Sequence, residues 1–179
     1  MADPAPAHLS RADFLALPEG PERRELFDGE LVVSPAPSPW HQVVLDRLHA
    51  QIRTWAVAQV PPWQALFAPV DVVFGAHHVL QPDLVLLRQP VAPGQRGPLT
   101  QVPALVAEVL SPGRVDQDRL AKRVVYAAAG VTAYLVVHPE AARVEAFEGV
   151  GLAARRSARD RLAVEILPGL VLDVAALFA

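Results

Sequence analysis

The order of apolar and polar residues in the first third of this chain predicts a short helix followed by a hairpin. Ser10 is suited to cap a helix whose first turn carries Asp13, and Leu17-Pro18 lies where that helix should end. Two extended runs within residues 24–33 flank Asp28-Gly29. This dipeptide favours a tight hairpin turn because both of its positions accept a positive φ.

Helical spacing of apolar residues predicts one long helix after the hairpin. Ser38-Pro39 is typical of a helix start, with a capping serine before proline at the first helical position, and Pro61-Pro62 is expected to stop the helix. The apolar positions that follow this spacing are Val43, Val44, Leu48, Ile52 and Trp55.

The rest of the chain reads mainly as strands around one further helix. Ala104 to Leu110 is an apolar run broken by one glutamate, which predicts a central strand covered on both faces. A helix is expected over Val115 to Ala129, with Gly130 as its stop. One face of that helix carries Leu120, Val124 and Ala128. The other expected strands cover 64–68, 70–74, 79–87, 133–137, 143–147, 151–155 and 162–166, with a closing helical turn near 174–178.

These elements predict one α/β domain spanning residues 1–179, with residues 1–9 flexible. We expect a mixed central sheet flanked by helices, with extra antiparallel strands. A chain of 179 residues is long enough to bury a core without disulfides or a structural metal.

Composition and charge narrow the class of protein. The chain has no cysteine, which excludes a disulfide framework, a thiolate zinc site and a cysteine nucleophile. It has no signal-peptide pattern and no apolar run near the roughly 20 residues that cross a bilayer, so a cytoplasmic location is expected. A net charge of −3 disfavours a general nucleic-acid coat protein, but it leaves room for an enzyme with a local basic strip.

Two acidic residues stand in apolar strand-like runs. Asp83 precedes four apolar residues, and Glu108 interrupts the predicted central strand. A buried carboxylate costs several kcal/mol unless a cation or a donor compensates it, and a hard divalent cation such as Mg²⁺ is one such compensator. Either acid could instead pair with an arginine, cap the backbone or lie on an exposed edge strand. The two acids together with Lys122, the single lysine beside 15 arginines, favour a shared site.

A series of short segments carries a family resemblance over nearly the whole chain, from about Ser10 to Phe178. The segments are Arg24-Glu25-Leu26-Phe27-Asp28-Gly29-Glu30-Leu31, Ser34-Pro35-Ala36-Pro37-Ser38 with His41, Gln81-Pro82-Asp83, Glu108-Val109-Leu110-Ser111-Pro112, and then Asp118, Lys122, Tyr126, Gly130 and Tyr134. In this order and spacing they resemble the Uma family of restriction-endonuclease-like proteins, within the PD-(D/E)XK nuclease superfamily. The resemblance implies a restriction-endonuclease-like fold.

The resemblance also implies roles for individual residues. Asp83 matches the "PD" acid and Glu108 the "(D/E)" acid, so both would be metal ligands, while Leu110 stands where the motif lysine is usual. Lys122 on the following helix would replace that lysine. Glu25 resembles an additional acid from the N-terminal segment, which would hold the metal or support its ligands. The family's Val-Asp-Pro and Ser-Thr pairs are replaced here by Val137-His138-Pro139 and Gly113-Arg114.

The mechanism that the resemblance implies is hydrolysis of a phosphodiester bond. A Mg²⁺ or Mn²⁺ ion would activate water, and Lys122 would orient or deprotonate that water or stabilise the developing charge. Possible substrate contacts are His41, Arg114, Arg119 and Arg123, each of which has an ordinary structural alternative.

Three functions remain open from the sequence. The first is a Mg²⁺- or Mn²⁺-dependent endodeoxyribonuclease acting on DNA. The second is a catalytically silent module of the same fold that serves in DNA binding or protein assembly, and the third is a ribonuclease. A homodimer is expected as well. Its surface could be the apolar segment Leu170 to Phe178, which could equally complete the core of one chain.

Overall fold

The structure is a computed structural model that describes residues 8–18, 20, 22–111 and 116–179, with the side chains of 116–119 left out. Its helices are α1 (Arg11–Leu15), α2 (Pro39–Val57), α3 (Asp116–Ala129) and α4 (Val174–Phe178), with a 3₁₀ turn η1 (Val150–Leu152). Its strands are β1 (Arg23–Phe27), β2 (Glu30–Ser34), β3 (Gln64–Phe67), β4 (Val72–Val73), β5 (Val79–Leu80), β6 (Leu84–Leu87), β7 (Leu105–Val109), β8 (Ala133–His138), β9 (Arg143–Glu148), β10 (Ala154–Ala158), β11 (Arg161–Ala163) and β12 (Val171–Asp173).

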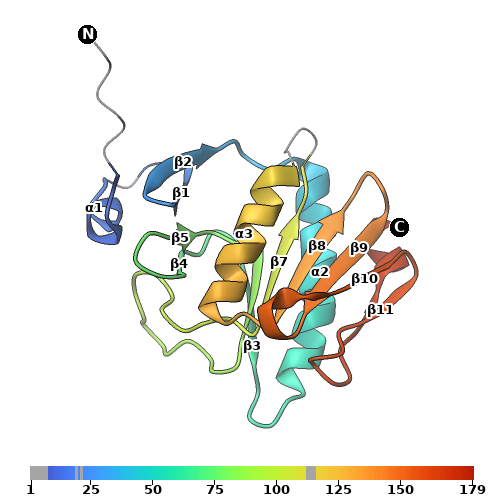
Figure 1. Ribbon diagram of the computed structural model, residues 1–179. Coiled ribbons are helices and arrows are strands. Elements are labelled where there is room, and N and C mark those ends of the chain that lie inside the picture. The colour runs from blue at the N-terminus through green and yellow to red at the C-terminus, as the bar shows by residue number, and fades with distance from the viewer. Residues whose placement is uncertain (1–7, 19, 21, 112–115) are drawn as a thin grey trace.

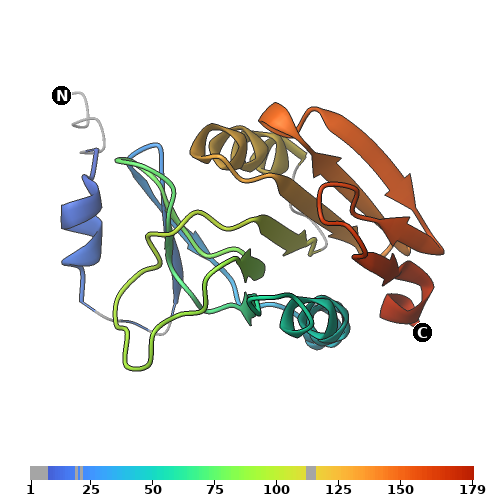
Figure 2. The ribbon, with the colours of Figure 1, turned by 90° about the horizontal axis from the view of Figure 1, so that it is seen from below.

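A six-stranded mixed sheet forms the middle layer, with α3 on one face and α2 on the other (Figures 1 and 2). Its strand order is β10-β9-β8-β7-β6-β3, so β7 lies in the interior of the sheet. Only β7 and β8 run parallel, and α3 makes the crossover between them. The predicted mixed sheet flanked by helices is therefore confirmed.

Alternating side chains divide the core into two layers. On β7, Leu105, Ala107 and Val109 pack toward α2, whereas Val106 belongs to the cluster on the α3 side. Every residue of this strand is buried, which confirms the predicted central strand. Glu108 follows the alternation and leaves the sheet on the same side as Val106.

A second, four-stranded sheet holds the N-terminal hairpin beside the large sheet, in the order β2-β1-β5-β4. Asp28 and Gly29 have φ of 49° and 79°, the positive values that the predicted hairpin turn requires. On β1, Leu26 packs with Phe14 of α1 and Val79 of β5. The neighbouring residues of β1 consequently project to the opposite face, toward the large sheet.

The C-terminal segment completes the interior of the chain. The side chains of Leu170, Leu172, Val174 and Leu177 are buried in the cluster that also contains the inner face of α2. The apolar character of this segment is thus accounted for within one chain. The expected homodimer, which would need another surface, stays a prediction.

Several predicted boundaries are wrong. The expected strand 79–87 is two strands, because residues 81–83 lie between β5 and β6, which belong to different sheets. The expected strand 70–74 is reduced to β4, and 151–155 begins in η1 rather than in a strand. The last expected strand, 162–166, ends at Ala163, and its partner β12 was not foreseen. The long helix ends at Val57, before the prolines expected to stop it.

The apolar row predicted on α3 lies on the exposed side of that helix. Leu120 and Val124 are 48% and 66% exposed, and Ala128 is exposed as well. The buried side of α3 instead carries Lys122, Val125 and Tyr126. The helix therefore turns a lysine and a tyrosine toward the sheet.

We expect Leu177→Ala to lower the free energy of unfolding by about 2–5 kcal/mol, because it leaves a cavity in the core behind α2. The matched control is Val171→Ala, since Val171 is 43% exposed in the same segment and its truncation should cost less than about 1 kcal/mol. Denaturant unfolding measures both values. An unchanged unfolding free energy in the Leu177 variant would show that the segment is not part of the core.

Candidate active site

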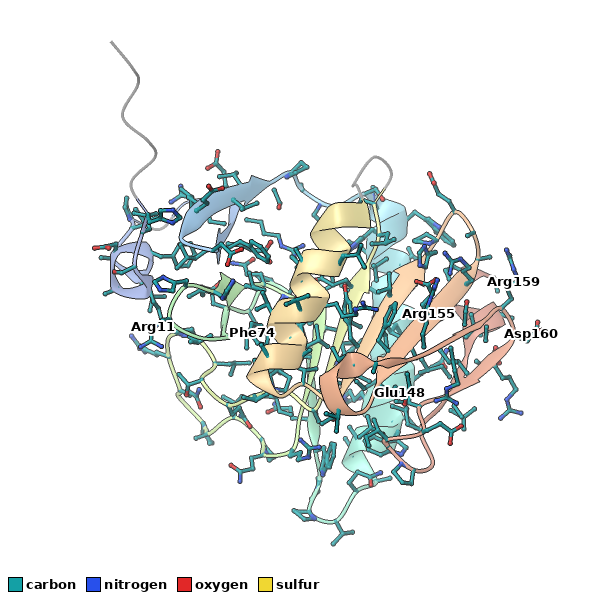
Figure 3. All side chains as sticks on the ribbon, viewed as in Figure 1. Arg11, Phe74, Glu148, Arg155, Arg159 and Asp160 are labelled. Carbon is teal, nitrogen blue, oxygen red and sulfur yellow. The ribbon has the colours of Figure 1, made fainter. Side chains whose placement is uncertain are left out.

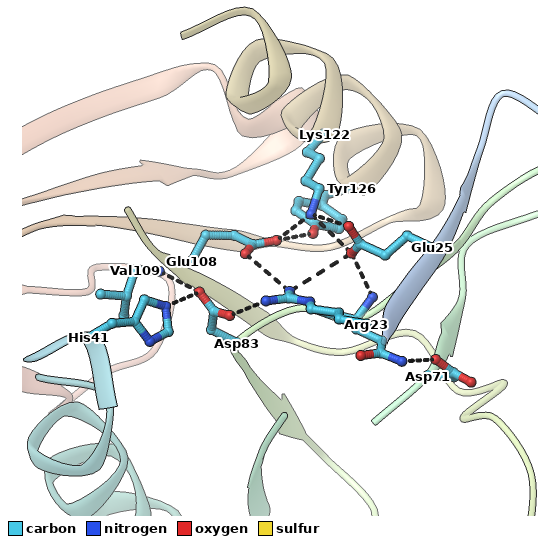
Figure 4. A network of polar contacts seen from close by, with 10 residues as sticks. Arg23, Glu25, His41, Asp71, Asp83, Glu108, Val109, Lys122 and Tyr126 are labelled. Carbon is cyan, nitrogen blue, oxygen red and sulfur yellow. Dashed lines mark hydrogen bonds and ion pairs between the residues drawn. The ribbon is translucent and has the colours of Figure 1, made fainter. Parts of the chain in front are cut away.

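Asp83 and Glu108 meet where β6 begins and β7 ends. These strands are antiparallel and pair Leu84 with Ala107, and one further step of that register sets Asp83 opposite Glu108. The two acids are only 2% and 7% exposed. Figure 4 shows both side chains pointing into the space between the large sheet, α3 and β1. The two acids singled out in the sequence are thus brought together.

Helix α3 supplies a cation and a hydroxyl to this acid pair. Lys122 Nζ lies 3.2 Å from Glu108 Oε1, and Tyr126 Oη donates to the same oxygen at 2.8 Å. The two residues are four positions apart, so they project from one side of the helix. Lys122 is 4% exposed, which places its ammonium inside the protein.

Strand β1 supplies Arg23 and Glu25, two positions apart and therefore on one face of the strand. Glu25 accepts from Lys122 Nζ at 3.0 and 3.1 Å, and its Oε1 also accepts from the backbone N–H of Gln81 at 2.8 Å. Glu25 is therefore the main partner of the buried lysine. The predicted additional acid lies in the cluster, next to Lys122.

Arg23 was not predicted, and it lies in the middle of the acids (Figure 4). Its Nη1 donates to Asp83 Oδ1 at 2.9 Å, and its Nη2 lies 3.9 Å from both Glu25 Oε1 and Glu108 Oε2. Nη2 also donates to the carbonyl of Gln81. The predicted strand began at residue 24, so its pattern stopped one residue short of this arginine.

His41, in the first turn of α2, holds the remaining oxygen of Asp83. Its Nε2 lies 3.2 Å from Asp83 Oδ2, which also accepts the backbone N–H of Val109 at 2.8 Å. Ser38 caps the helix by accepting from the His41 N–H, so the cap fixes the position of the ring. His41 therefore contacts one of the two predicted acids.

The cluster contains three carboxylates and two cationic side chains, which leaves one negative charge unmatched. Burial is the main cause that raises the pKa of Glu108, to about 7; Lys122 opposes the rise, while Asp83 and Glu25 add to it. Burial also acts to raise the pKa of Asp83, but His41 and Arg23 outweigh it and hold that pKa below its usual value. The unmatched charge is therefore felt mainly at Glu108.

The charge state of Lys122 follows from its two acidic neighbours. Burial alone would lower its pKa, but Glu108 and Glu25 raise the pKa above the usual value for lysine. The side chain is an ammonium in this arrangement. It is suited to stabilise negative charge rather than to accept a proton.

A buried glutamate outside this cluster, Glu145, shows the opposite balance of charge. Glu145 on β9 accepts from Arg143 and from Arg155, the latter at 2.6 Å, and His138 lies 3.3 Å away. Burial acts to raise its pKa, but these partners lower it to about 2. Figure 3 shows Arg155 on the β9–β10 side of the molecule, where it forms part of this network. Around Glu145 the cationic side chains outnumber the carboxylate, whereas around Glu108 the carboxylates outnumber the cationic side chains.

Of the three arginines predicted to contact a substrate, only Arg123 has a side chain that the structure describes. Arg123 stacks over Phe147 of β9, with its guanidinium carbon 4.7 Å from the ring centroid. Among the described residues, it makes no hydrogen bond or ion pair with the acid cluster. Arg114 lies outside the described residues, and so does the side chain of Arg119.

A divalent cation needs several oxygen ligands, and the carboxylates of this cluster are the groups that could supply them. In the described part of the chain, no three or more acidic or histidine side chains are grouped so that they could hold a metal ion directly. The acids are separated by Arg23 and Lys122, which lie between them. Carboxylate oxygens are nevertheless the ligands that Mg²⁺ and Mn²⁺ prefer, and the unmatched charge leaves room for a cation of higher charge. The residues fit such an ion if the guanidinium moves.

Comparison with known proteins places the chain in a family. The family model Uma2, described as "Putative restriction endonuclease", matches residues 11–175, and the chain belongs to this family. A crystal structure described as "a putative nuclease belonging to DUF820", from Anabaena variabilis ATCC 29413, superposes with a TM-score of 0.80. The two chains are 18% identical over 95% of this chain and 97% of the other, which shows a shared fold. The expected restriction-endonuclease-like fold is thus confirmed.

No curated protein matches this chain. No helix in the described ranges is long and apolar enough to cross a membrane.

The raised pKa of Glu108 predicts how stability depends on pH. Because the folded state prefers the neutral carboxyl, its contribution is fully present below about pH 4.5 and is lost as pH rises through about 7. The loss is on the order of 3 kcal/mol in the metal-free protein. We expect Glu108→Gln to remove this fall, measured as unfolding free energy between pH 4.5 and 8.

The control is Glu140→Gln, which changes an exposed acid in the turn after β8 and should follow the wild-type curve. A Glu108→Gln curve parallel to the wild type would contradict the assigned charge balance.

Proposed function

We propose that this chain is a metal-dependent nuclease that hydrolyses DNA phosphodiester bonds. The observation that carries the proposal is the pair Asp83 and Glu108, which are buried side by side and next to Lys122. They lie where β6 begins and β7 ends in the large sheet. A buried acid pair is costly, and a structural role alone would be served as well by apolar residues. Membership of a restriction-endonuclease-type family supports the same reading.

Asp83 and Glu108 would hold the Mg²⁺ or Mn²⁺ ion, with Glu25 close by. When bound, the ion supplies a Lewis acid for the phosphate and lowers the pKa of a bound water. His41 and the Val109 N–H fix one oxygen of Asp83, and Tyr126 fixes one oxygen of Glu108. Each acid is thereby held with its other oxygen directed into the site.

Lys122 would stabilise the negative charge that builds on the phosphate oxygens. Its ammonium is buried and held by Glu25, so it is already oriented before a substrate arrives. Of the roles considered for this lysine, its raised pKa supports charge stabilisation over proton abstraction.

Access to Asp83 is provided by a cavity of about 320 Å³. It is large enough to take part of a nucleotide, and its walls combine polar side chains with prolines. The lining residues are Gly20, Glu22, Arg23, Pro37, His41, Gln42, Leu45, Ala68, Pro69, Gln81 and Asp83. A substrate phosphate entering here would approach Asp83.

The alternative is a catalytically silent module of the same fold that acts in DNA binding or protein assembly. The observation in its favour is Arg23, which already donates to Asp83 and so serves as a protein-supplied counter-ion for the acids. A fixed guanidinium would make the cluster a structural element rather than a metal site.

Cleavage assays with Mg²⁺ or Mn²⁺ distinguish the two functions. We expect wild-type protein to cut DNA, and Asp83→Asn, Glu108→Gln and Lys122→Met each to lower the rate about 100-fold or more, because each removes a ligand or the charge beside it. Glu140→Gln is the control and should keep the wild-type rate. RNA substrates run in parallel test the ribonuclease reading. Absence of cleavage of single- and double-stranded DNA and of RNA by wild type would favour the silent module.

A further inference from the structure

We infer that Arg23 is a displaceable counter-ion, so that its guanidinium and a divalent cation alternate in one position between Asp83 and Glu108. The inference rests on the proposed function, since it concerns how the acid pair comes to hold a metal. It assigns a role to a residue that neither the family motif nor the sequence pattern singled out.

The first argument is the number of oxygens that remain available. Asp83 Oδ2 accepts from His41 and from the Val109 N–H, which leaves Oδ1. Glu108 Oε1 accepts from Lys122 and Tyr126, which leaves Oε2. Both remaining oxygens face Arg23, at 2.9 Å from Nη1 and 3.9 Å from Nη2. The guanidinium thus occupies the side of the acid pair that has ligand capacity left.

The second argument is the space that a metal ion needs. Mg²⁺ binds oxygen at about 2.0–2.1 Å and surrounds itself with six ligands, of which several are usually waters. Asp83 and Glu108 would hold such an ion through the oxygens that the two terminal nitrogens of Arg23 now face. The ion and the guanidinium therefore exclude each other.

The third argument is charge. When Asp83, Glu25 and Glu108 are all ionised, the three carboxylates exceed the cations Arg23 and Lys122 by one charge. A divalent ion in place of the guanidinium cancels that charge, because it brings one positive charge more than arginine does. Exchange is therefore favourable on electrostatic grounds in a buried site, where an unmatched charge is costly.

Arg23 has space beside it into which its side chain can move, in contrast to Lys122. The Nε of Arg23 is one of two buried side-chain polar atoms without a hydrogen-bond partner among the described residues. Its side chain is 17% exposed, against 5% for Lys122, and it lines two hollows of about 490 and 320 Å³. Lys122 is held by both oxygens of Glu25. Arg23 donates to Asp83 and to the Gln81 carbonyl, but of the two cations it is the more exposed and has the room to move.

The test is Mn²⁺ titration by calorimetry at pH 8, with wild type, Arg23→Gln and Arg24→Gln. Arg24 is the matched control, because it is the next residue on β1 and pairs with Glu22 at the surface. We expect Arg23→Gln to bind Mn²⁺ about tenfold more tightly than wild type, since no guanidinium competes. Arg24→Gln should bind as wild type does.

Thermal unfolding gives a second test. If the role of Arg23 were only structural, the effect of its replacement on melting would not depend on Mn²⁺. In the absence of metal, Arg23→Gln should melt below wild type because the acids lose a counter-ion. At saturating Mn²⁺ that deficit should disappear, since Arg23 no longer contributes to the cluster. A deficit of equal size with and without Mn²⁺ would overturn the inference.

The outcomes separate the inference from the proposed function. Equal or weaker Mn²⁺ binding by Arg23→Gln, beside measurable binding by wild type, overturns the inference and leaves the metal-dependent nuclease standing. Absence of Mn²⁺ binding by wild type and by Arg23→Gln overturns both.

Should Arg23→Gln fail to fold, Arg23→Lys keeps the charge on a shorter side chain and should bind Mn²⁺ more tightly than wild type, by less than tenfold. Binding equal to wild type would overturn the inference.

Discussion

The charge of three carboxylates buried at the ends of neighbouring strands must be neutralised, and the arrangement of the surrounding elements follows from that constraint. The large sheet contributes Asp83 and Glu108, and the hairpin contributes Glu25. Lys122 and Arg23 reach the same place from α3 and β1, so that helix, hairpin and sheet are joined through charge as well as through apolar packing. Removing one partner from such a cluster leaves a buried charge uncompensated, which ties the geometry of the site to the stability of the fold.

Much of this site could be predicted from the sequence, because a carboxylate inside an apolar strand is conspicuous. Asp83 and Glu108 stood out for that reason, and Lys122 stood out as a single lysine among many arginines. Arg23 did not, since nothing in its own neighbourhood distinguishes one arginine from fifteen. Its partner Asp83 is 60 residues away, and only the pairing of β1 with β5 brings the hairpin to the acids.

The limits of the fold prediction have similar causes. A continuous apolar run identified the interior strand β7, and helical spacing identified the long helix α2, whose predicted apolar positions are mostly buried, although Val43 is exposed. The apolar pattern failed over residues 79–87, where the chain passes from one sheet to another and Gln81-Pro82-Asp83 separates two short apolar strands. On α3, apolar spacing predicted the wrong buried face, because polar groups inside a protein, such as Lys122 and Tyr126, are recognised by their partners rather than by their spacing.

The central claim is that Asp83 and Glu108 form a cation site that the protein closes with its own guanidinium. The most direct measurement is anomalous diffraction from a crystal of the wild-type protein grown with Mn²⁺. The account predicts one strong peak within bonding distance of Asp83 Oδ1 and Glu108 Oε2, with Arg23 turned away from Asp83. A peak elsewhere, or a peak at the acids with Arg23 still bonded to Asp83, would contradict it.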